Sequence, residues 1–424
     1  MTVLIAGAGI AGLSLGLSLH QVGIPFRIFE AVREIRPLGV GINLQPHASR
    51  ELFELGLETG LDEIGLRTKE VAYFSQHGQL IWREPRGRHA GYNWPQYSIH
   101  RGGLQMLLLR SLQDRCGDVV TTGAAVTGWR DTANGVGIDL TDRQTGASLG
   151  QVEGAVLIAA DGINSTLRAG LYPDEGAARW GGTMMWRGLT RGPKFLTGRS
   201  VTMTGRKDVK FVAYPIGDTG EGGSLINWIA DLTMPPDYAW RKQDWNRSGA
   251  LDDFLGPFAD WRFDWLDIPA VIRAAEHVYE YPMVDRDPLD RWTHGRLTLL
   301  GDAAHAMYPI GSNGASQGIL DARVLAAAMR DNGPTTEALE AYESTRREAV
   351  NALVLANRGD GPDRILDIVA DRAPEGFDDI EDVMPLTERQ QFADGYKQVA
   401  GMDIAALNAR APLIAVATEG TGRP

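Results

Sequence analysis

The chain opens with an apolar run that gives way at once to glycines and then to a helical pattern. Residues 3–6 are apolar, Gly7-Ala8-Gly9-Ile10-Ala11-Gly12 follows, and leucines recur from Leu13 to Leu19. A second apolar run, residues 26–29, ends in Glu30. This pattern predicts a strand, a glycine-rich turn, a helix and a second strand that ends in an acid.

That order of elements is typical of a site for an adenine dinucleotide. Gly7 allows the tight turn, Gly9 lets the backbone approach a pyrophosphate, and Gly12 lets the helix pack on the strand. The helix N-terminus then faces the phosphates, and Glu30 can bind a ribose hydroxyl. Many glycine turns are only turns, so the prediction depends on the strand, helix and acid that accompany this one.

Two further apolar runs also end in an acid. Residues 296–300 lead into Gly301-Asp302, and a loop of small residues follows at 311–318. We interpret this as a buried strand that delivers a carboxylate to the sheet edge, with a loop whose backbone can lie against something flat. Residues 155–160 lead similarly into Asp161, for which a structural role as a helix cap is the alternative.

The rest of the chain predicts a second, sheet-rich region and several helices. Leucines from 104 to 112 indicate an amphipathic helix, and a longer helical pattern covers 336–357. Residues 180–281 are rich in tryptophan and alternate in stretches such as 209–214 and 225–229. We therefore expect an α/β protein in which a Rossmann-type domain is interleaved with a sheet-rich domain and followed by a helical C-terminus.

Composition excludes several classes of function. The 424 residues carry 54 acids and 42 bases, a formal charge of −12, which argues against a nucleic-acid surface. No apolar run is long enough to span a bilayer, and we expect no signal peptide at the glycine-rich start. Cys116 is the single cysteine, so an intrachain disulfide or thiolate metal site is excluded. We expect a cytoplasmic protein without a metal.

The three motifs at 7–12, 161–168 and 301–309 resemble, in this order, those of the class A flavin-dependent aromatic hydroxylases, the para-hydroxybenzoate hydroxylase-like family. The resemblance covers roughly residues 1–358. Further stretches are closer still to the phenazine-modifying bacterial members of the family, and these are 36–46, 97–102, 185–188, 281–288 and 299–317. The tail beyond residue 360 does not share this resemblance.

The resemblance implies bound FAD, with NADH or NADPH as a transient co-substrate. The implied domains are an FAD-binding domain (1–75, 100–178 and 281–358), a substrate-binding domain (76–99 and 179–280) and a C-terminal helical extension (359–424). The implied FAD-binding residues, some of which the turn patterns also indicate, are Gly7, Gly9, Gly12, Glu30, Arg33, Gly41, Arg101, Val126, Asp161, Asp302, Gly311, Asn313 and Gly314.

The implied reaction is hydroxylation of an aromatic or N-heteroaromatic small molecule by O2 through a flavin hydroperoxide. The cofactor carries the chemistry, so no catalytic side chain is assigned. Strand alternation and the loop after Asp302 suggest substrate contacts at Trp186, Met203, Tyr214, Asn227, Met307 and Pro309. For each, a place in the core is the alternative, and His305 is expected to fill the domain interior rather than to act in catalysis.

Other functions stay open at this point. A related flavoprotein that reduces or halogenates is one alternative, although the Trp-x-Trp-x-Ile-Pro signature of flavin halogenases is absent. A non-catalytic flavin-binding redox module is another. The sequence does not choose the ring, decide whether a carboxylated substrate loses its carboxylate, or indicate the oligomeric state.

Overall fold

A six-stranded sheet forms the centre of the nucleotide-binding part. The computed structural model describes residues 2–240, 247–359 and 361–414. The sheet has the order β20 (Thr293–His294), β21 (Leu297–Leu299), β12 (Val156–Ala159), β1 (Val3–Ala6), β2 (Phe26–Glu30) and β8 (Val120–Thr122). All neighbours except β20 and β21 run parallel. The strands β1 and β12 are wholly apolar and buried, as expected for parallel strands covered on both faces.

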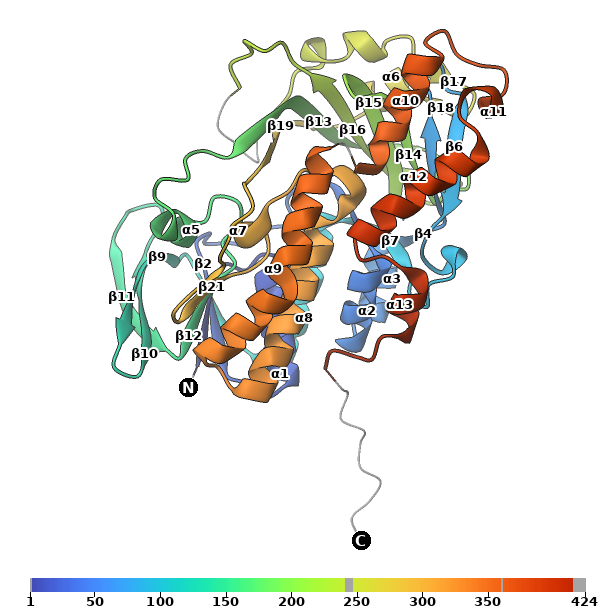
Figure 1. Cartoon of the computed structure of the whole chain (residues 1–424). Coiled ribbons are helices and arrows are strands. Elements are labelled where there is room, and N and C mark those ends of the chain that lie inside the picture. Colours follow the sequence, from blue (N-terminus) through green and yellow to red (C-terminus); the bar gives the residue numbers. More distant parts are fainter. Residues whose placement is uncertain (1, 241–246, 360, 415–424) are drawn as a thin grey trace.

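Helices pack against this sheet and against each other. The predicted first helix is α1 (Ile10–Gln21), and α4 (Arg101–Cys116), α8 (Gly314–Asn332) and α9 (Thr336–Arg358) follow later in the chain. The helix α1 contacts both α4 and α8. The helix α8 lies beside α9 (Figure 1). The long helical pattern predicted for 336–357 is therefore a single helix against the nucleotide-binding part.

Two smaller sheets flank the centre. One joins β9 (Ala125–Thr132), β10 (Gly135–Thr141) and β11 (Ser148–Gly154), and α5 (Thr166–Leu171) packs on β9. The other joins β3 (Gly41–Leu44), β7 (Gln96–His100) and β4 (Gly65–Thr68) beside α2 (Pro46–Glu54) and α3 (Glu58–Ile64). This second small sheet connects the nucleotide-binding part to the large sheet described next.

The sheet-rich region is a seven-stranded, mostly antiparallel sheet. Its order is β19 (Val278–Asp285), β13 (Arg179–Pro193), β16 (Gly223–Thr233), β15 (Val209–Asp218), β14 (Ser200–Arg206), β5 (Glu70–Phe74) and β6 (Leu80–Pro85). The strand β5 precedes the predicted boundary at 75, and β19 crosses the one at 281. The outer face is covered by an aromatic layer in which Trp186 and Trp228 pack against Phe254 and Phe258. This layer includes η2 (Leu251–Asp253), η3 (Gly256–Phe258), β17 (Arg262–Phe263), β18 (Leu266–Asp267) and α6 (Ile268–Arg273).

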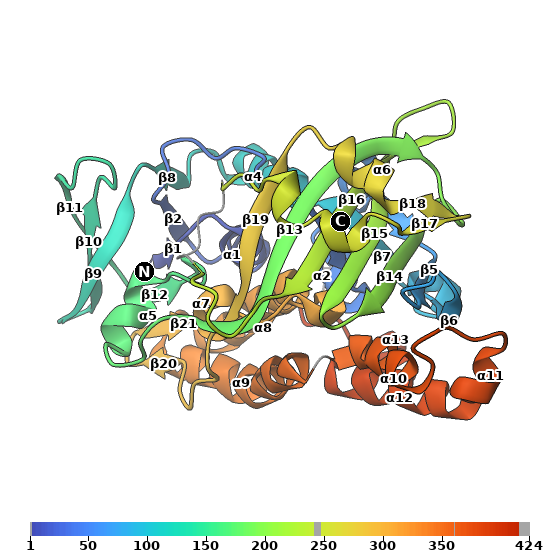
Figure 2. The same ribbon diagram turned by 90° about the horizontal axis from the view of Figure 1, so that it is seen from above.

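The C-terminal extension continues in one layer with α9 (Figure 2). It comprises η5 (Gly361–Asp363), α10 (Arg364–Arg372), α11 (Ile380–Val383), α12 (Leu386–Val399) and α13 (Ile404–Ala409). Ile365, Leu366, Val369 and Met384 share an apolar cluster with the inner face of the large sheet. The extension is therefore part of the core. The predicted helical C-terminus is confirmed, although residues 360 and 415–424 lie outside the described part of the chain.

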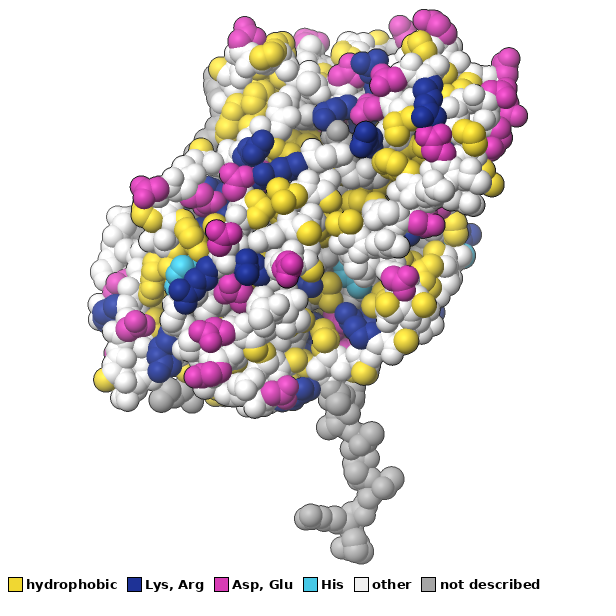
Figure 3. Space-filling view, viewed as in Figure 1, with side chains coloured by type: hydrophobic (Ala, Val, Ile, Leu, Met, Phe, Trp, Pro, Cys, Tyr) yellow, Lys and Arg dark blue, Asp and Glu magenta, His cyan; other side chains and the backbone are white. Residues whose placement is uncertain are grey.

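The surface of the face in Figure 3 mixes acidic, basic and apolar side chains. Among the described helices, none combines the length and the apolar character that crossing a bilayer requires.

Candidate active site

The three glycines of the first turn have different surroundings. Gly7 has a φ of +104°, and a Cβ there would collide with the carbonyl oxygen of Ala160. A Cβ at Gly12 would collide with the carbonyl oxygen of Gly7, whereas one at Gly9 would meet nothing within 4 Å. The turn thus requires glycine at 7 and 12 for its own packing and leaves open space at Gly9, where a phosphate can approach the backbone.

The end of β2 lies beside this turn. The carboxylate of Glu30 accepts hydrogen bonds from the N–H groups of Ala8 (2.8 Å) and Val32 (2.9 Å). The N–H of Ala124, just before β9, donates to the carbonyl oxygen of Glu30 (2.9 Å), and Val126 on β9 is buried. Arg33 is about half exposed and forms an ion pair of 2.6 Å with Asp142. Glu30 and Val126 are therefore brought near the turn, while Arg33 is engaged on the surface.

The motif at Gly301-Asp302 begins the short helix α7 (Asp302–His305). Asp302 is exposed toward the cavity described below. Behind it, the buried Asp321 of α8 accepts the N–H of Gly301 (3.2 Å), lies 2.5 Å from Nε2 of His305, and pairs with Arg346 (2.8 Å). Burial opposes the ionisation of Asp321, but His305 and Arg346 outweigh it and lower its pKa. His305 thus lies in the interior, where it supports the turn.

The Asp161 motif caps the start of α5. Oδ2 of Asp161 accepts the N–H of Thr166 (3.0 Å), and the Ser165 hydroxyl accepts that of Arg168 (2.9 Å). Oδ1 of Asp161 has no hydrogen-bond partner among the described residues, and burial raises the pKa of this carboxyl. These contacts match a role of Asp161 as a helix cap, and Oδ1 stays available for a ligand.

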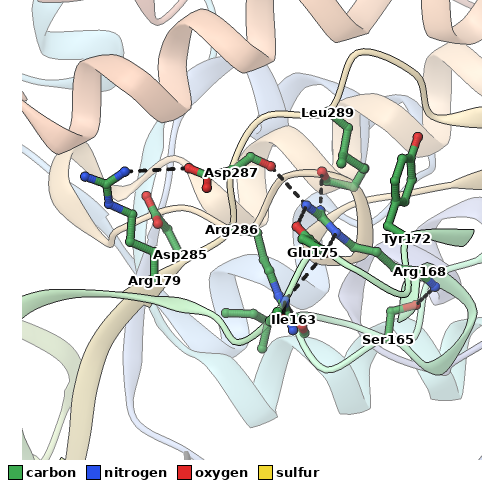
Figure 4. A network of polar contacts seen from close by, with 12 residues as sticks. Ile163, Ser165, Arg168, Tyr172, Glu175, Arg179, Asp285, Arg286, Asp287 and Leu289 are labelled. Atoms are coloured by element: carbon green, nitrogen blue, oxygen red, sulfur yellow. Dashed lines mark hydrogen bonds and ion pairs between the residues drawn. The ribbon is translucent and has the colours of Figure 1, made fainter. Parts of the chain in front are cut away.

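Arg168 ties this motif to α7. Its buried guanidinium donates to the carbonyls of Ala303 (3.0 Å), Ala304 (2.8 Å) and Asp287 (2.9 Å), and it forms an ion pair with Glu175 (Figure 4). A bidentate guanidinium fork suits such a junction because it satisfies several acceptors at once. The second and third sequence motifs are therefore held together by one side chain.

A cavity of about 330 Å³ opens between these turns and the inner face of the seven-stranded sheet. This volume lies in the range of small-molecule sites. The nucleotide-binding part contributes backbone-rich segments at 9–11, 300–302 and 311–315, and β3 contributes 41–43. Arg101 also lines the cavity. The sheet contributes a mainly apolar wall formed by Met185, Val201, Met203, Val212, Tyr214, Ile229 and Met283.

The loop before α8 is shaped by unusual backbone angles and by the C-terminal extension. Gly311 and Ser312 have φ values of +70° and +55°. Nδ2 of the buried Asn313 donates to the carbonyl of Gly311 (3.1 Å) and to the Tyr396 hydroxyl of α12 (2.9 Å). Gly311 and Gly314 line the cavity, so the N-terminus of α8 faces it. A helix N-terminus with free N–H groups favours negative charge.

Four of the six predicted substrate residues line the cavity: Met203, Tyr214, Met307 and Pro309. The prediction for Trp186 is wrong, because Met185 and Arg187 occupy the cavity face of β13 and Trp186 points into the aromatic layer, stacked on Phe254. Successive strand residues face opposite sides of a sheet, so one wrong choice of face moves the side chain into the core.

Asn227 is on the inner face but does not line the cavity. Its Oδ1 accepts the N–H of Gly41 (2.6 Å), and Arg187 donates to the carbonyl of Gly41 (2.8 Å). Both polar side chains therefore hold β3 against the large sheet. The prediction of Asn227 as a cavity residue is wrong for this reason, whereas Gly41 does line the cavity.

Sequence reasoning missed three charged residues of the cavity wall, Lys210, Asp231 and Asp363. The alternation that suggests Tyr214 also reaches Lys210 on the same strand, so a signal was present for that residue. Asp231 lies four residues after Asn227 on β16 and therefore on the same face of the sheet, so the alternation that suggests Asn227 also indicates Asp231. No pattern in the sequence indicates Asp363, which η5 brings to the cavity from the C-terminal extension.

The site fits an adenine dinucleotide joined to a flat ring system. Gly9, the carboxylate of Asp302 and the backbone loop at Gly311 line one cavity that also has the apolar wall, and Glu30 lies beside the first turn through its bond to Ala8. The fold and this arrangement define a dinucleotide-binding flavoprotein. Residues 1–185 and 275–357 match the family model described as an FAD binding domain. The chain belongs to this family.

Known relatives agree with this assignment. The chain is 47% identical to the phenazine 1,6-dicarboxylic acid hydroxylase PhzS of Lysobacter antibioticus, over 84% of this chain and 89% of that protein. It is 32% identical to the aurachin C monooxygenase/isomerase of Stigmatella aurantiaca, over 84% and 87%. Its fold is similar to Klebsiella pneumoniae HpxO complexed with FAD and uric acid, with a TM-score of 0.71, 25% identity and 95% of each chain covered.

The comparisons confirm the predicted fold class, the FAD cofactor and the class of flavin-dependent aromatic hydroxylases. NADH or NADPH is the reductant typical of this class. The relatives favour hydroxylation over the reductase, halogenase and non-catalytic alternatives.

Proposed function

We propose that this enzyme uses NAD(P)H to insert one atom of O2 into a small N-heteroaromatic compound of the phenazine type. The observation that carries the proposal is the cavity, which joins a backbone-rich path suited to FAD to an apolar wall suited to a fused ring. The 47% identity to a phenazine hydroxylase supports this substrate class.

We assign FAD to the path from the first turn to α8. The turn shaped by Gly7 and Gly12 would hold the pyrophosphate, with Gly9 as its closest approach. Glu30 would bind the adenosine ribose, and Asp302 would bind near the ribityl chain. Gly311, Asn313 and Gly314 form the loop against the isoalloxazine, with Gly41 and Arg101 on its other side. When bound, FAD supplies the redox chemistry, from electron uptake to oxygen transfer.

The protein's own residues bind and orient the substrate and exclude water. Met203, Met307 and Tyr214 offer polarisable and aromatic surface to a flat ring, which reduces the motion of the reacting carbon. The apolar wall keeps bulk water from the reacting centre. The N-terminus of α8, next to Gly314, stabilises negative charge that develops on the cofactor.

The test is to supply the FAD-loaded enzyme with NADH or NADPH, ¹⁸O2 and a panel of phenazines, quinolines, pyridines and aromatic acids. We expect one fused N-heteroaromatic to stimulate NAD(P)H oxidation with little release of hydrogen peroxide. Its product should contain one ¹⁸O atom, and its mass reports whether a carboxylate is lost. Oxidation of NAD(P)H that no compound stimulates, or products without ¹⁸O, would contradict the proposal.

A further inference from the structure

Three charged side chains meet on the cavity face of the seven-stranded sheet, in a wall that is otherwise mainly apolar. Lys210 lies on β15, Asp231 on β16 and Asp363 on η5 of the C-terminal extension. Nζ of Lys210 lies 2.6 Å from Oδ2 of Asp363 and 3.4 Å from Oδ2 of Asp231. None of the three residues is more than 7% exposed, and all line the cavity.

The cluster leaves two carboxylate oxygens unpaired. Lys210 approaches one oxygen of each acid, whereas Oδ1 of Asp231 and Oδ1 of Asp363 have no hydrogen-bond partner among the described residues. Buried polar atoms in folded proteins are nearly always paired. An ionised carboxylate can only accept hydrogen bonds, so the missing partners must be donors.

The charges of the cluster also favour a hydrogen-bond donor as the ligand. Burial opposes the charge of Lys210, but Asp363 and Asp231 outweigh it and raise its pKa, so the lysine stays protonated. Lys210 lies beside both acids, and Arg187 in the same cavity wall also lowers the pKa of Asp231, yet burial keeps that pKa raised. Lys210 occupies one oxygen of each acid, so a substrate carboxylate beside the two open oxygens would face like charges, whereas a donor group would satisfy them.

We propose that Asp231 and Asp363, held in place by Lys210, form the specificity-determining end of the substrate cavity and bind a hydroxyl or ring N–H of the heteroaromatic substrate. The inference rests on the proposed function, because it takes this cavity as the substrate site. It also gives the C-terminal extension a role in substrate choice, since η5 supplies Asp363.

A smaller hollow of about 50 Å³ is lined by the same three residues and by other polar side chains, among them Thr183, Lys207, Tyr308 and Arg358. It offers a competing explanation, in which water satisfies the two oxygens and the cluster is purely structural. The two explanations differ in whether the enzyme discriminates between ligands with and without a donor.

The experiment compares 2-hydroxyphenazine and 2-methoxyphenazine as ligands of the full-length, FAD-loaded enzyme, with binding followed by the flavin absorbance spectrum. The hydroxy and methoxy compounds share one ring system and differ in the donor. We expect the enzyme to prefer the hydroxy compound about 10- to 100-fold, the range expected for a hydrogen bond to a charged acceptor.

Asp231→Asn and Asp363→Asn, made separately, replace an accepting oxygen by a donating amide. A hydroxyl donates a single hydrogen bond, so at least one of the two variants should reduce the preference for the hydroxy compound about tenfold or more. Asp218→Asn, at the end of β15 in a surface ion pair with Arg199, should leave the preference unchanged. Because the two acids are tested one at a time, a variant that fails to take up FAD leaves the other to decide.

The inference would be overturned by equal affinity for the hydroxy and methoxy compounds in the unmodified enzyme, by a preference that both Asn variants retain, or by no binding of either compound. Failure of the proposed function is distinguishable, because binding does not require turnover. A donor preference without ¹⁸O incorporation supports the inference and contradicts the proposed function, and ¹⁸O incorporation without a preference does the opposite.

Discussion

Gly9 shows at the residue scale how the first turn separates folding from ligand binding. Gly7 and Gly12 are needed by the turn itself, whereas a Cβ at Gly9 has free space. We therefore expect Gly9→Ala to fold with an unchanged melting temperature in the FAD-free state. Its affinity for FAD should fall about tenfold or more, because one lost hydrogen bond to a phosphate costs roughly 1.5–3 kcal/mol.

Equilibrium dialysis or quenching of flavin fluorescence measures this affinity. Gly256→Ala in η3 is a matched control, since a Cβ there also meets nothing within 4 Å but lies in the aromatic layer of the other sheet. If the two variants bound FAD with equal affinity, the prediction that the FAD phosphate approaches the backbone at Gly9 would be wrong.

His47 supplies a second prediction at the residue scale, on pH dependence. The side chain is buried in α2, neither ring nitrogen has a hydrogen-bond partner among the described residues, and burial together with Arg346 and Arg410 lowers its pKa from 6.5 to about 3. Between these values the unfolded chain binds a proton that the folded chain does not, so stability falls as the pH falls through this window. The loss between pH 8 and pH 5 should be about 2 kcal/mol.

His47→Leu removes this titration while keeping an apolar side chain of similar size. Guanidinium unfolding of both proteins at pH 8 and pH 5 measures the difference. The unmodified enzyme should lose more stability on acidification than the variant. Parallel losses would show that His47 is not the group responsible.

At the scale of elements, α12 shapes the loop that we assign to the flavin. The Tyr396 hydroxyl bonds to Asn313 (2.9 Å) and Asn357 (3.1 Å) and occupies the space where Gly311 would carry a Cβ. Tyr396→Phe removes both hydrogen bonds, and we expect a loss of about 1–3 kcal/mol of stability. Because the loop becomes looser, the flavin spectrum should shift and hydrogen peroxide release should rise.

Tyr172→Phe is the matched control for this prediction. The Tyr172 hydroxyl also has two partners, the carbonyl of Arg291 (2.6 Å) and His294 (2.8 Å), far from the loop in sequence and outside the cavity wall. It should cost similar stability without changing the spectrum. If both variants or neither changed the spectrum, α12 would not act on the loop specifically.

The elements also show which parts of the site a sequence can predict. Glycine turns and strand-end acids at 7–12, 161 and 302 are local patterns, and their backbone geometry agrees with the predicted turns. The face of β13 was not predictable, because Trp186 and Met185 are both apolar and only tertiary packing decides which one is covered by Phe254. Asp363 pairs with a lysine 153 residues away and Tyr396 with an asparagine 83 residues away. No local pattern contains such contacts.

At the scale of the whole molecule, the cavity is the meeting point of parts that otherwise have separate cores. The six-stranded sheet and the seven-stranded sheet belong to different apolar clusters. At the cavity, the polar contacts of Asn227 and Arg187 with the backbone of Gly41 join the seven-stranded sheet to β3 of the nucleotide-binding part. Such contacts exchange more readily than a packed core, so the cavity region should be the least protected part of the FAD-free enzyme.

FAD should therefore stabilise the molecule unevenly. A ligand that binds only the folded state at about 100 times its dissociation constant adds about 2.7 kcal/mol. We expect hydrogen exchange to slow on FAD addition at residues 8–12, 41–43 and 311–315, which line the cavity or the first turn. In the sheet of β9, β10 and β11, exchange should change little outside β9, which contacts β2, because no residue of this sheet lines the cavity. Slowing that is equal in β10, β11 and the cavity segments would mean that FAD acts on global unfolding alone, and the two cores would then behave as one cooperative unit.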